Sequence, residues 1–165
     1  MMKRIAKGLL SLSELVICYS GVADVTWPKG VKMFYDADAF EAALNDPKNF
    51  GAHVMIDESA ILYDEARSRK NYPAINRIAS AGRHKGFTCY FSTQHSKSIP
   101  PIVRNNCGEV YVFAVSGDDN AEHIEKFCSN VSVGGERMRD FIVRQKPLEY
   151  VRYDVGEFKT YLGRL

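Results

Sequence analysis

The chain has 165 residues, of which 45% are hydrophobic and 25% charged, so it is neither disordered nor fibrous and suits one globular domain. Its formal net charge of +2 gives no overall case for coating a nucleic acid or a membrane surface. Any DNA binding must therefore come from a local patch. No apolar run approaches the about 20 residues that cross a bilayer, so no membrane segment is expected.

The four cysteines are predicted to be buried free thiols of a reducing compartment. Cys18, Cys89, Cys107 and Cys128 are far apart, with no CxxC motif and no Cys/His pair at zinc-site spacing. The four histidines also lack metal-ligand spacing. Cysteine–histidine catalysis is disfavoured because nothing in the sequence places a thiol beside an imidazole.

Helices and strands are expected to alternate along the chain. The capping box Asp38–Glu41 predicts a helix start, and Pro73 suits a first helical turn. In chain order the pattern predicts a helix over 2–13, a strand over 15–19, a loop over 22–32, a helix from 38 to 44, a strand over 53–56, an irregular stretch over 59–71, a helix over 73–83, a strand over 87–91, a short helix or turn at 99–104, a strand over 110–115, a helix over 119–128, a short helix after 134–135 and an edge strand over 148–155.

The predicted strands are continuous apolar runs, which is typical of a mostly parallel sheet that helices cover on both faces. In such sheets the chemistry lies beyond the carboxyl ends of the strands. The residues that follow the strands at 53–56 and 87–91 are therefore the first candidates for a site.

The segment Val54-Met55-Ile56-Asp57-Glu58 delivers two acids to a strand tip, as in a Walker B motif. In that motif the aspartate holds Mg²⁺ and the glutamate polarises the water that attacks the γ-phosphate. Taken alone, the pattern also fits an acidic strand end or a helix N-cap.

The segment Phe91-Ser92-Thr93-Gln94 ends the next strand with an amide side chain. A glutamine there can hydrogen-bond both the attacking water and the γ-phosphate. Taken alone, Gln94 also fits an ordinary loop amide.

The order of four elements closely resembles the FtsK/HerA superfamily of P-loop ATPases. The elements are the Walker B pattern, the phrase Arg83-His84-Lys85-Gly86 before the strand and Ser92-Thr93-Gln94, the stretch 99–106, and the strand 110–115. Viral DNA-packaging ATPases and Zot-type phage assembly ATPases are the members that it resembles most. The resemblance covers residues 50–128 well and 1–49 loosely.

The resemblance implies roles for individual residues. Asp57 matches the Mg²⁺ aspartate, Glu58 the catalytic glutamate, and Gln94 the residue that senses the γ-phosphate. Arg104 and Arg83 are the candidates for an arginine finger that reaches the neighbouring subunit's nucleotide, with Arg104 favoured. A surface salt bridge or a DNA-phosphate contact remains the alternative for Arg104, and a solvated helix end the alternative for Arg83.

The sequence departs from this family because it contains no G-x-x-x-x-G-K-[ST] phosphate loop. Without its backbone amides and lysine, Mg·ATP lacks a main anchor, so the 165 residues alone are expected to bind ATP poorly. In the family a helix and a strand follow that loop, as residues 1–13 and 15–19 do here. We therefore expect a truncated chain, whose missing first strand belongs between the strands at 87–92 and 109–115.

The resemblance implies a three-layer α/β P-loop NTPase of the ASCE, RecA/FtsK-like type. We expect one ATPase-type domain over 1–165, with a core over 1–130 and a helix and edge-strand extension over 131–165. Its cofactors would be ATP and Mg²⁺, and its work the translocation of double-stranded DNA by a homo-oligomeric ring. A viral capsid or portal vertex is a further expected partner, and the location would be the host cytoplasm or the virion.

Three alternatives remain open at this point. The chain can be a Zot-type phage assembly ATPase, although a membrane segment is expected there. It can be an unrelated α/β binding domain. It can also be a nucleotide-free homologue that acts as a structural or DNA-binding subunit, with a basic patch made of Arg67, Arg69, Lys70, Arg77, Arg83, His84 and Lys85.

Overall fold

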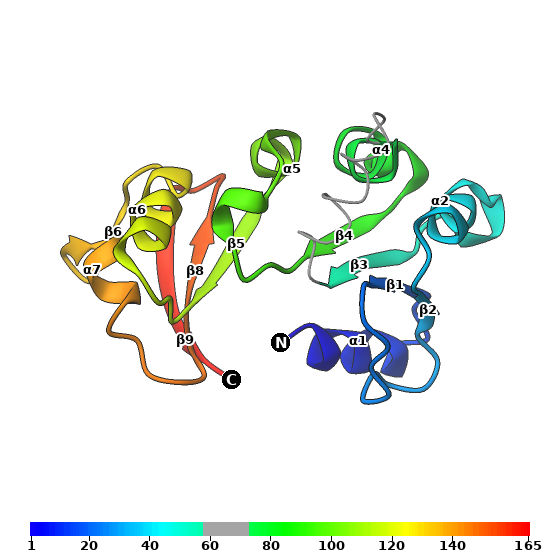
Figure 1. The fold of residues 1–165 in the computed structure, drawn as a ribbon, viewed down its shortest axis with the longest axis horizontal. Helices are drawn as coiled ribbons and strands as arrows, with labels where there is room; N and C mark the ends of the chain where they lie inside the picture. Colours follow the sequence, from blue (N-terminus) through cyan, green and yellow to red (C-terminus); the bar gives the residue numbers. More distant parts are fainter. Residues whose placement is uncertain (58–72) are drawn as a thin grey trace. The chain divides into compact units, whose positions relative to one another are not determined.

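The structure is a computed structural model that describes residues 1–57 and 73–165 (Figure 1). The chain forms two compact units. The first comprises residues 1–94 and 98–103, and the second comprises residues 95–97 and 104–165. Each unit has its own sheet and its own buried core, so each is described by itself.

The first unit contains a parallel sheet of four strands in the order β2-β1-β3-β4. The strands are β1 (Val16–Ser20), β2 (Lys32–Phe34), β3 (His53–Asp57) and β4 (Thr88–Phe91). The helices are α1 (Met2–Ser11), α2 (Ala37–Asn45), α4 (Pro73–Ala81) and the short 3₁₀ helices η1 (Pro47–Asn49) and η2 (Gly82–Lys85). The 3₁₀ helix η3 (Ser96–Ser98) and the helix α5 (Pro101–Asn106) have residues in both units.

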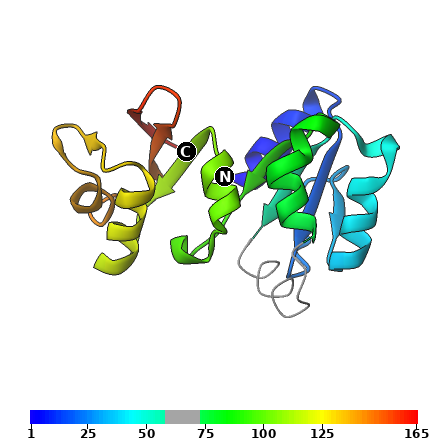
Figure 2. The same ribbon diagram turned by 90° about the horizontal axis from the view of Figure 1, so that it is seen from above.

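Helices cover both faces of this sheet, with α1 on one side and α2 and α4 on the other (Figures 1 and 2). Alternate residues of β1 explain the arrangement, because Cys18 packs with Ala6 of α1 and Met55 of β3 in one cluster. On the opposite face the Tyr19 and Phe40 rings meet with their centroids 5.3 Å apart. All five residues of β1 are buried, as a strand covered on both faces requires.

The second unit is built on an antiparallel sheet in the order β5-β8-β9. Its strands are β5 (Glu109–Phe113), β8 (Glu149–Asp154) and β9 (Lys159–Arg164), and β6 (Ser132–Val133) pairs with β7 (Glu136–Arg137) as a hairpin. The helices α6 (Asp118–Phe127) and α7 (Met138–Ile142) complete it. Its core contains Val112, Ala121, Cys128, Val133, Met138, Ile142, Val151 and Tyr153.

Most of the expected elements are confirmed within a few residues, and three expectations are corrected. The segment predicted as an edge strand is β8, which lies between β5 and β9 because residues 159–164 form a further strand that sequence reasoning missed. The stretch expected as a loop over 22–32 ends in the short strand β2, which pairs in parallel with β1.

The third correction concerns the start of α2. Asp36, and not Asp38, is the N-cap, and its carboxylate accepts a hydrogen bond from the Ala39 amide at 2.8 Å. Because the helix begins at Ala37, Glu41 lies beyond the capping position and instead forms an ion pair with Arg77 at 2.9 Å.

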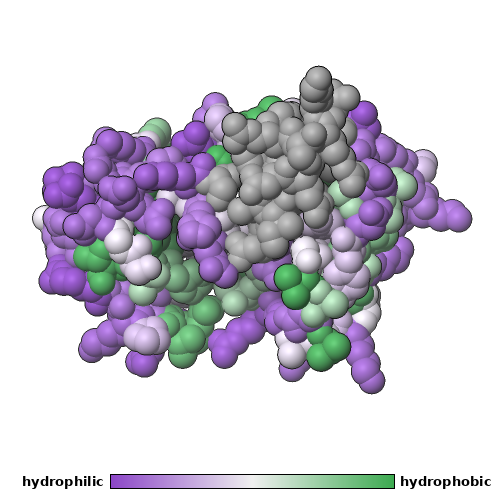
Figure 3. Space-filling model, viewed as in Figure 1, coloured by the Kyte–Doolittle hydropathy of each residue, from purple (hydrophilic) through white to green (hydrophobic). Residues whose placement is uncertain are grey.

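Exposed apolar side chains occur in both units, singly or in small groups among hydrophilic residues (Figure 3). Val25 is 98% exposed in the first unit and Phe158 is 63% exposed in the second. Among the residues that the structure describes, no helix combines the length and the apolar character that a membrane crossing requires.

Candidate functional site

The carboxyl ends of three adjacent parallel strands place Ser20, Asp57 and Ser92 side by side. Ser20 of β1 is paired in register with Asp57 of β3, and Ser92 directly follows β4. The Ser92 amide donates a hydrogen bond to the Ile56 carbonyl at 3.0 Å, which continues the ladder between β3 and β4. Parallel pairing thus brings the predicted Mg²⁺ aspartate and the start of the Ser92-Thr93-Gln94 segment to one edge of the sheet.

Within this edge the Ser92 hydroxyl donates a hydrogen bond to Oδ1 of Asp57 at 2.7 Å. The two side chains are half-buried. Sequence reasoning singled out the segment that contains Ser92 but assigned no role to its hydroxyl. The only signal available was a hydroxyl residue at the end of the strand next to the one that ends in Asp57.

The donor set at this edge fits a hard divalent cation. Burial raises the pKa of the Cys18 thiol to about 12, and the negative charge of Asp57 contributes to the same shift. Cys18 therefore stays protonated at neutral pH and does not offer a thiolate ligand. A carboxylate flanked by hydroxyl groups suits Mg²⁺, which prefers oxygen ligands and keeps several of its waters.

Of the two other residues predicted for this edge, one lies among the described residues and one does not. Gln94 is exposed in the loop that follows β4, two residues after Ser92. Glu58, the predicted catalytic glutamate, lies outside the described residues. No group of three or more His, Cys, Asp or Glu residues that could hold a metal occurs in the described ranges.

Arg83 lies at the other end of the sheet. It is exposed on η2, which precedes β4, and the neighbouring Lys85 carbonyl accepts a hydrogen bond from the Gly51 amide, just before β3 begins. The four residues of β4 place about 13 Å of strand between this end and the end that carries Asp57. The fold of a single chain therefore keeps Arg83 and Asp57 at opposite ends of the sheet.

Arg104 belongs to the second unit, on α5. Its Nε atom is buried and has no hydrogen-bond partner among the described residues. Its charge contributes, after partial burial of the imidazole, to lowering the pKa of His123. The guanidinium is thus a partly buried cation without a carboxylate partner in the described part of the chain.

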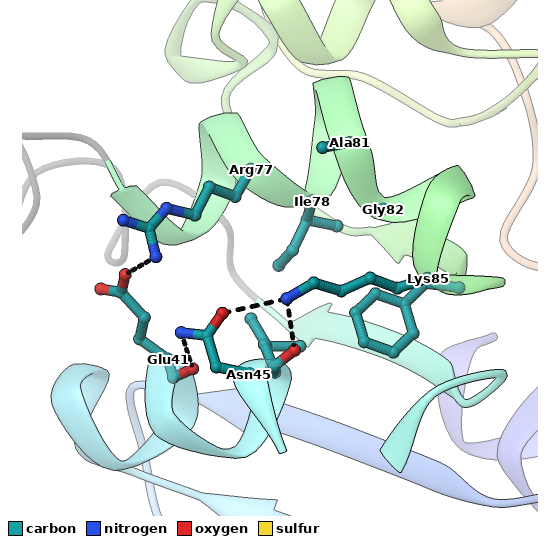
Figure 4. A pocket seen from close by; sticks show the side chains of 9 residues that line it. Glu41, Asn45, Arg77, Ile78, Ala81, Gly82 and Lys85 are labelled. Atoms are coloured by element: carbon teal, nitrogen blue, oxygen red, sulfur yellow. Dashed lines mark hydrogen bonds and ion pairs between the residues drawn. The ribbon is translucent and has the colours of Figure 1, made fainter. Parts of the chain in front are cut away.

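A small cavity of about 70 Å³ lies between α2 and α4 (Figure 4). Arg77 pairs with Glu41 at one side of it, and at the other the Lys85 ammonium donates to the Leu44 carbonyl and to Oδ1 of Asn45, each at 2.9 Å. The cavity is far below the size of a nucleotide pocket. It contains neither Asp57 nor Ser92.

These contacts also bear on the basic patch that sequence reasoning offered for DNA. Arg77 and Lys85 connect α4 and η2 to α2, so their charges already have partners within the unit. Arg83 and His84 are exposed. The other three cations of the patch, Arg67, Arg69 and Lys70, lie outside the described residues.

The four cysteines are free, as expected, and Cys18 and Cys128 are buried. Burial raises the pKa of the half-buried Cys89 to about 12 and raises that of Cys107 as well. Their thiols therefore remain protonated near neutral pH, which agrees with the view that they are not catalytic nucleophiles.

Comparison with protein-family models and with curated proteins gives no match. Solved structures do match. The genome-packaging NTPase B204 of Sulfolobus turreted icosahedral virus 2, in complex with AMPPCP, aligns at a TM-score of 0.73 with 20% identity, over 97% of this chain and 87% of that one. The chain shares the fold of that structure. The three-layer α/β class that the sequence predicted is thereby confirmed.

Two further structures support this fold. B204 of Sulfolobus turreted icosahedral virus, a DNA-packaging ATPase, aligns at a TM-score of 0.73 with 18% identity, over 99% of this chain and 89% of that one. The pCW3 conjugation coupling protein TcpA, with ATPγS, aligns at a TM-score of 0.67 with 15% identity, over 94% of this chain and 53% of that one. The fold of this chain is therefore also similar to that of a conjugation coupling protein.

Proposed function

We propose that this chain is part of an ATPase that packages a viral genome by translocating double-stranded DNA. The observation that carries the proposal is Asp57 at the carboxyl end of β3, hydrogen-bonded by Ser92 from the adjacent strand, in a packaging-NTPase fold. Such a strand end is where ligands bind in open α/β sheets. The neighbours' complexes with AMPPCP and ATPγS support a nucleotide as the ligand.

In this proposal Asp57 holds Mg²⁺ through its carboxylate. When bound, the cation neutralises charge that develops on the transferred phosphoryl group. Glu58 polarises the attacking water, and the exposed Gln94 amide donates to the γ-phosphate. An arginine stabilises the remaining negative charge, and Arg104 is the favoured candidate because its buried Nε has no hydrogen-bond partner among the described residues.

The position of Arg83 gives it a narrower role. Because it lies at the amino end of β4, it could reach a γ-phosphate only on another subunit. If Arg83 is the arginine finger, the protein must therefore form a homo-oligomeric ring. The proposal for Arg104 depends instead on its partly buried charge. We propose such a ring, working at a capsid or portal vertex in the host cytoplasm or the virion.

The phosphate loop is the part of the machinery that the 165 residues do not contain. We propose that it comes from a segment outside them, together with a strand. The outer edge of β4 supports this, since β4 pairs only with β3 in the described sheet. A parallel strand at that edge would pair with the open backbone groups of β4 and end beside Ser92, with β4 between it and Asp57.

The test is Mg²⁺-dependent ATP hydrolysis by the protein isolated from its native source. Its intact mass is measured first, because a mass above 18.6 kDa is expected if the phosphate loop precedes the chain. In that protein Glu58→Gln should abolish turnover, while Glu122→Gln, at an exposed ion pair on α6, should retain it. Turnover that persists in Glu58→Gln contradicts the ATPase proposal.

A second candidate is a nucleotide-free subunit that binds DNA. The observation that favours it is the absence of the phosphate-loop motif from the sequence. A native mass of 18.6 kDa together with steep salt-dependent binding of duplex DNA, in the absence of nucleotide, supports this candidate over the first.

A further inference from the structure

The hydroxyl of Ser92 contacts the side chain that is the predicted cation ligand. The Ser92 hydroxyl donates to Oδ1 of Asp57 at 2.7 Å, a short distance typical of a hydrogen bond to a charged carboxylate. The Ser92 backbone is fixed independently, because its amide donates to the Ile56 carbonyl. The hydroxyl is thus presented to Asp57 by the pairing of β3 with β4.

The other hydroxyl at this edge does not share this contact. Ser20 lies in register with Asp57, but its Oγ donates to the Val22 carbonyl at 2.9 Å and accepts from the Val22 amide at 3.4 Å. Its hydrogen-bonding capacity serves the turn after β1. Ser92 is therefore the described side chain that orients the Asp57 carboxylate.

A carboxylate held through one oxygen presents the other in a fixed direction. Within the described residues, the Asp57 carboxylate has no hydrogen bond besides that from Ser92 and no ion pair, so Oδ2 is left for a ligand. Groups that orient a metal ligand in this way usually affect metal affinity about 10- to 100-fold when they are removed.

We propose that Ser92 is a positioning residue for a divalent cation, because its hydroxyl holds Oδ1 of Asp57 and leaves Oδ2 as the oxygen that would bind the cation. The inference rests on the proposed function, in which Asp57 binds Mg²⁺. It adds a role for the first residue of the Ser92-Thr93-Gln94 segment. One strand end then serves both the cation, through Ser92, and the γ-phosphate, through Gln94.

The test is a titration of the 165-residue chain with Mn²⁺ alone, a paramagnetic substitute for Mg²⁺. Binding is followed through the broadening of the backbone amide signals of Asp57 and Ser92 in NMR spectra. Ser92→Ala should raise the apparent dissociation constant about 10-fold, while Ser92→Thr, which keeps the hydroxyl, should restore most of the affinity. Ser11→Ala, at an exposed hydroxyl on α1, is the matched control and should bind as the parent chain does.

Asp57→Asn separates the two possible failures. If Asp57→Asn abolishes the broadening and Ser92→Ala leaves it unchanged, the positioning role is overturned and the cation site stands. If Asp57→Asn binds Mn²⁺ as the parent chain does, the cation site of the proposed function fails. Should Ser92→Ala not fold, Ser92→Thr against Ser92→Val gives the same comparison, because these two differ only in the hydroxyl. Equal affinity of that pair likewise overturns the positioning role.

Discussion

Arg137 holds the carboxylate of Glu125 through two hydrogen bonds, from Nε at 3.2 Å and from Nη2 at 2.5 Å. Glu125 on α6 is 3% exposed and is the only acidic or basic residue among the buried ones that the structure describes. The Arg137 side chain on β7 remains more than half exposed. This pair therefore satisfies a buried charge and connects α6 to the hairpin of β6 and β7.

Removing the arginine should be costly because it leaves the Glu125 carboxylate buried and unpaired. We expect Arg137→Ala to lower the free energy of unfolding, although by less than the about 3–5 kcal/mol that breaking a fully buried pair costs, because water screens the half-exposed guanidinium. Arg139→Ala is the matched control, since Arg139 makes an exposed pair with its neighbour Asp140 and should change stability by less than about 1 kcal/mol. Urea denaturation measures both. Equal effects of the two variants would show that the Glu125 pair does not stabilise the unit.

The start of α2 gives a second prediction. The Asp36 carboxylate satisfies the Ala39 amide, so Asp36→Ala should lower the free energy of unfolding by about 1 kcal/mol. Asp36→Asn keeps a side-chain acceptor at the N-cap and should be nearly neutral. If Asp36→Asn costs as much as Asp36→Ala, the capping hydrogen bond is not the source of the effect.

The error over this cap illustrates which features the sequence could reveal. The Asp38–Glu41 spacing satisfied the capping-box rule, but so local a rule could not show that the helix begins one residue after Asp36. The long apolar runs at β1 and β3 were predicted correctly because both faces of those strands are buried. The strand β9 was missed because four of its six residues are exposed or charged and its pairing with β8 is tertiary.

The candidate site shows the same division between local and non-local information. Asp57 and Gln94 could be placed at strand ends from the apolar runs that precede them. The Ser92–Asp57 hydrogen bond could not, because it depends on the register between two strands separated by more than thirty positions. The position of Arg83 at the opposite end of β4 also depends on the direction in which that strand pairs.

Gly86 provides a third prediction. It follows η2 with φ of 72°, and a Cβ there would lie 3.3 Å from the Gly51 backbone. Gly86→Ala should therefore lower the free energy of unfolding by about 1–2 kcal/mol, the usual cost of a left-handed conformation for an L-residue. Gly108→Ala is the control, because a Cβ there meets no atom within 4 Å and its φ is not positive. The two variants are compared by thermal and urea unfolding. A Gly86→Ala chain as stable as the parent chain would contradict the inference that an alanine is strained in this turn.

His123 makes the stability of the second unit dependent on pH. Its Nδ1 lies 3.1 Å from the Ser96 hydroxyl, and partial burial, followed by the charges of Arg104, Lys97 and Lys126, lowers its pKa below the usual 6.5. As pH falls through about 6.5, the unfolded chain binds a proton at this residue before the folded chain does. The free energy of unfolding should therefore decrease from neutral to mildly acidic pH.

Urea denaturation of the parent chain and of His123→Asn at pH 7.5 and pH 5.5 isolates this contribution, because Asn keeps a polar atom near Ser96 but does not titrate. The parent chain should lose stability relative to His123→Asn as pH is lowered. Above pH 7 the free energies of unfolding of the two chains should change with pH in the same way. A parent chain that gains stability relative to the variant at pH 5.5 would mean that the folded state raises the pKa of His123. The cations around it would then be outweighed by an acidic group.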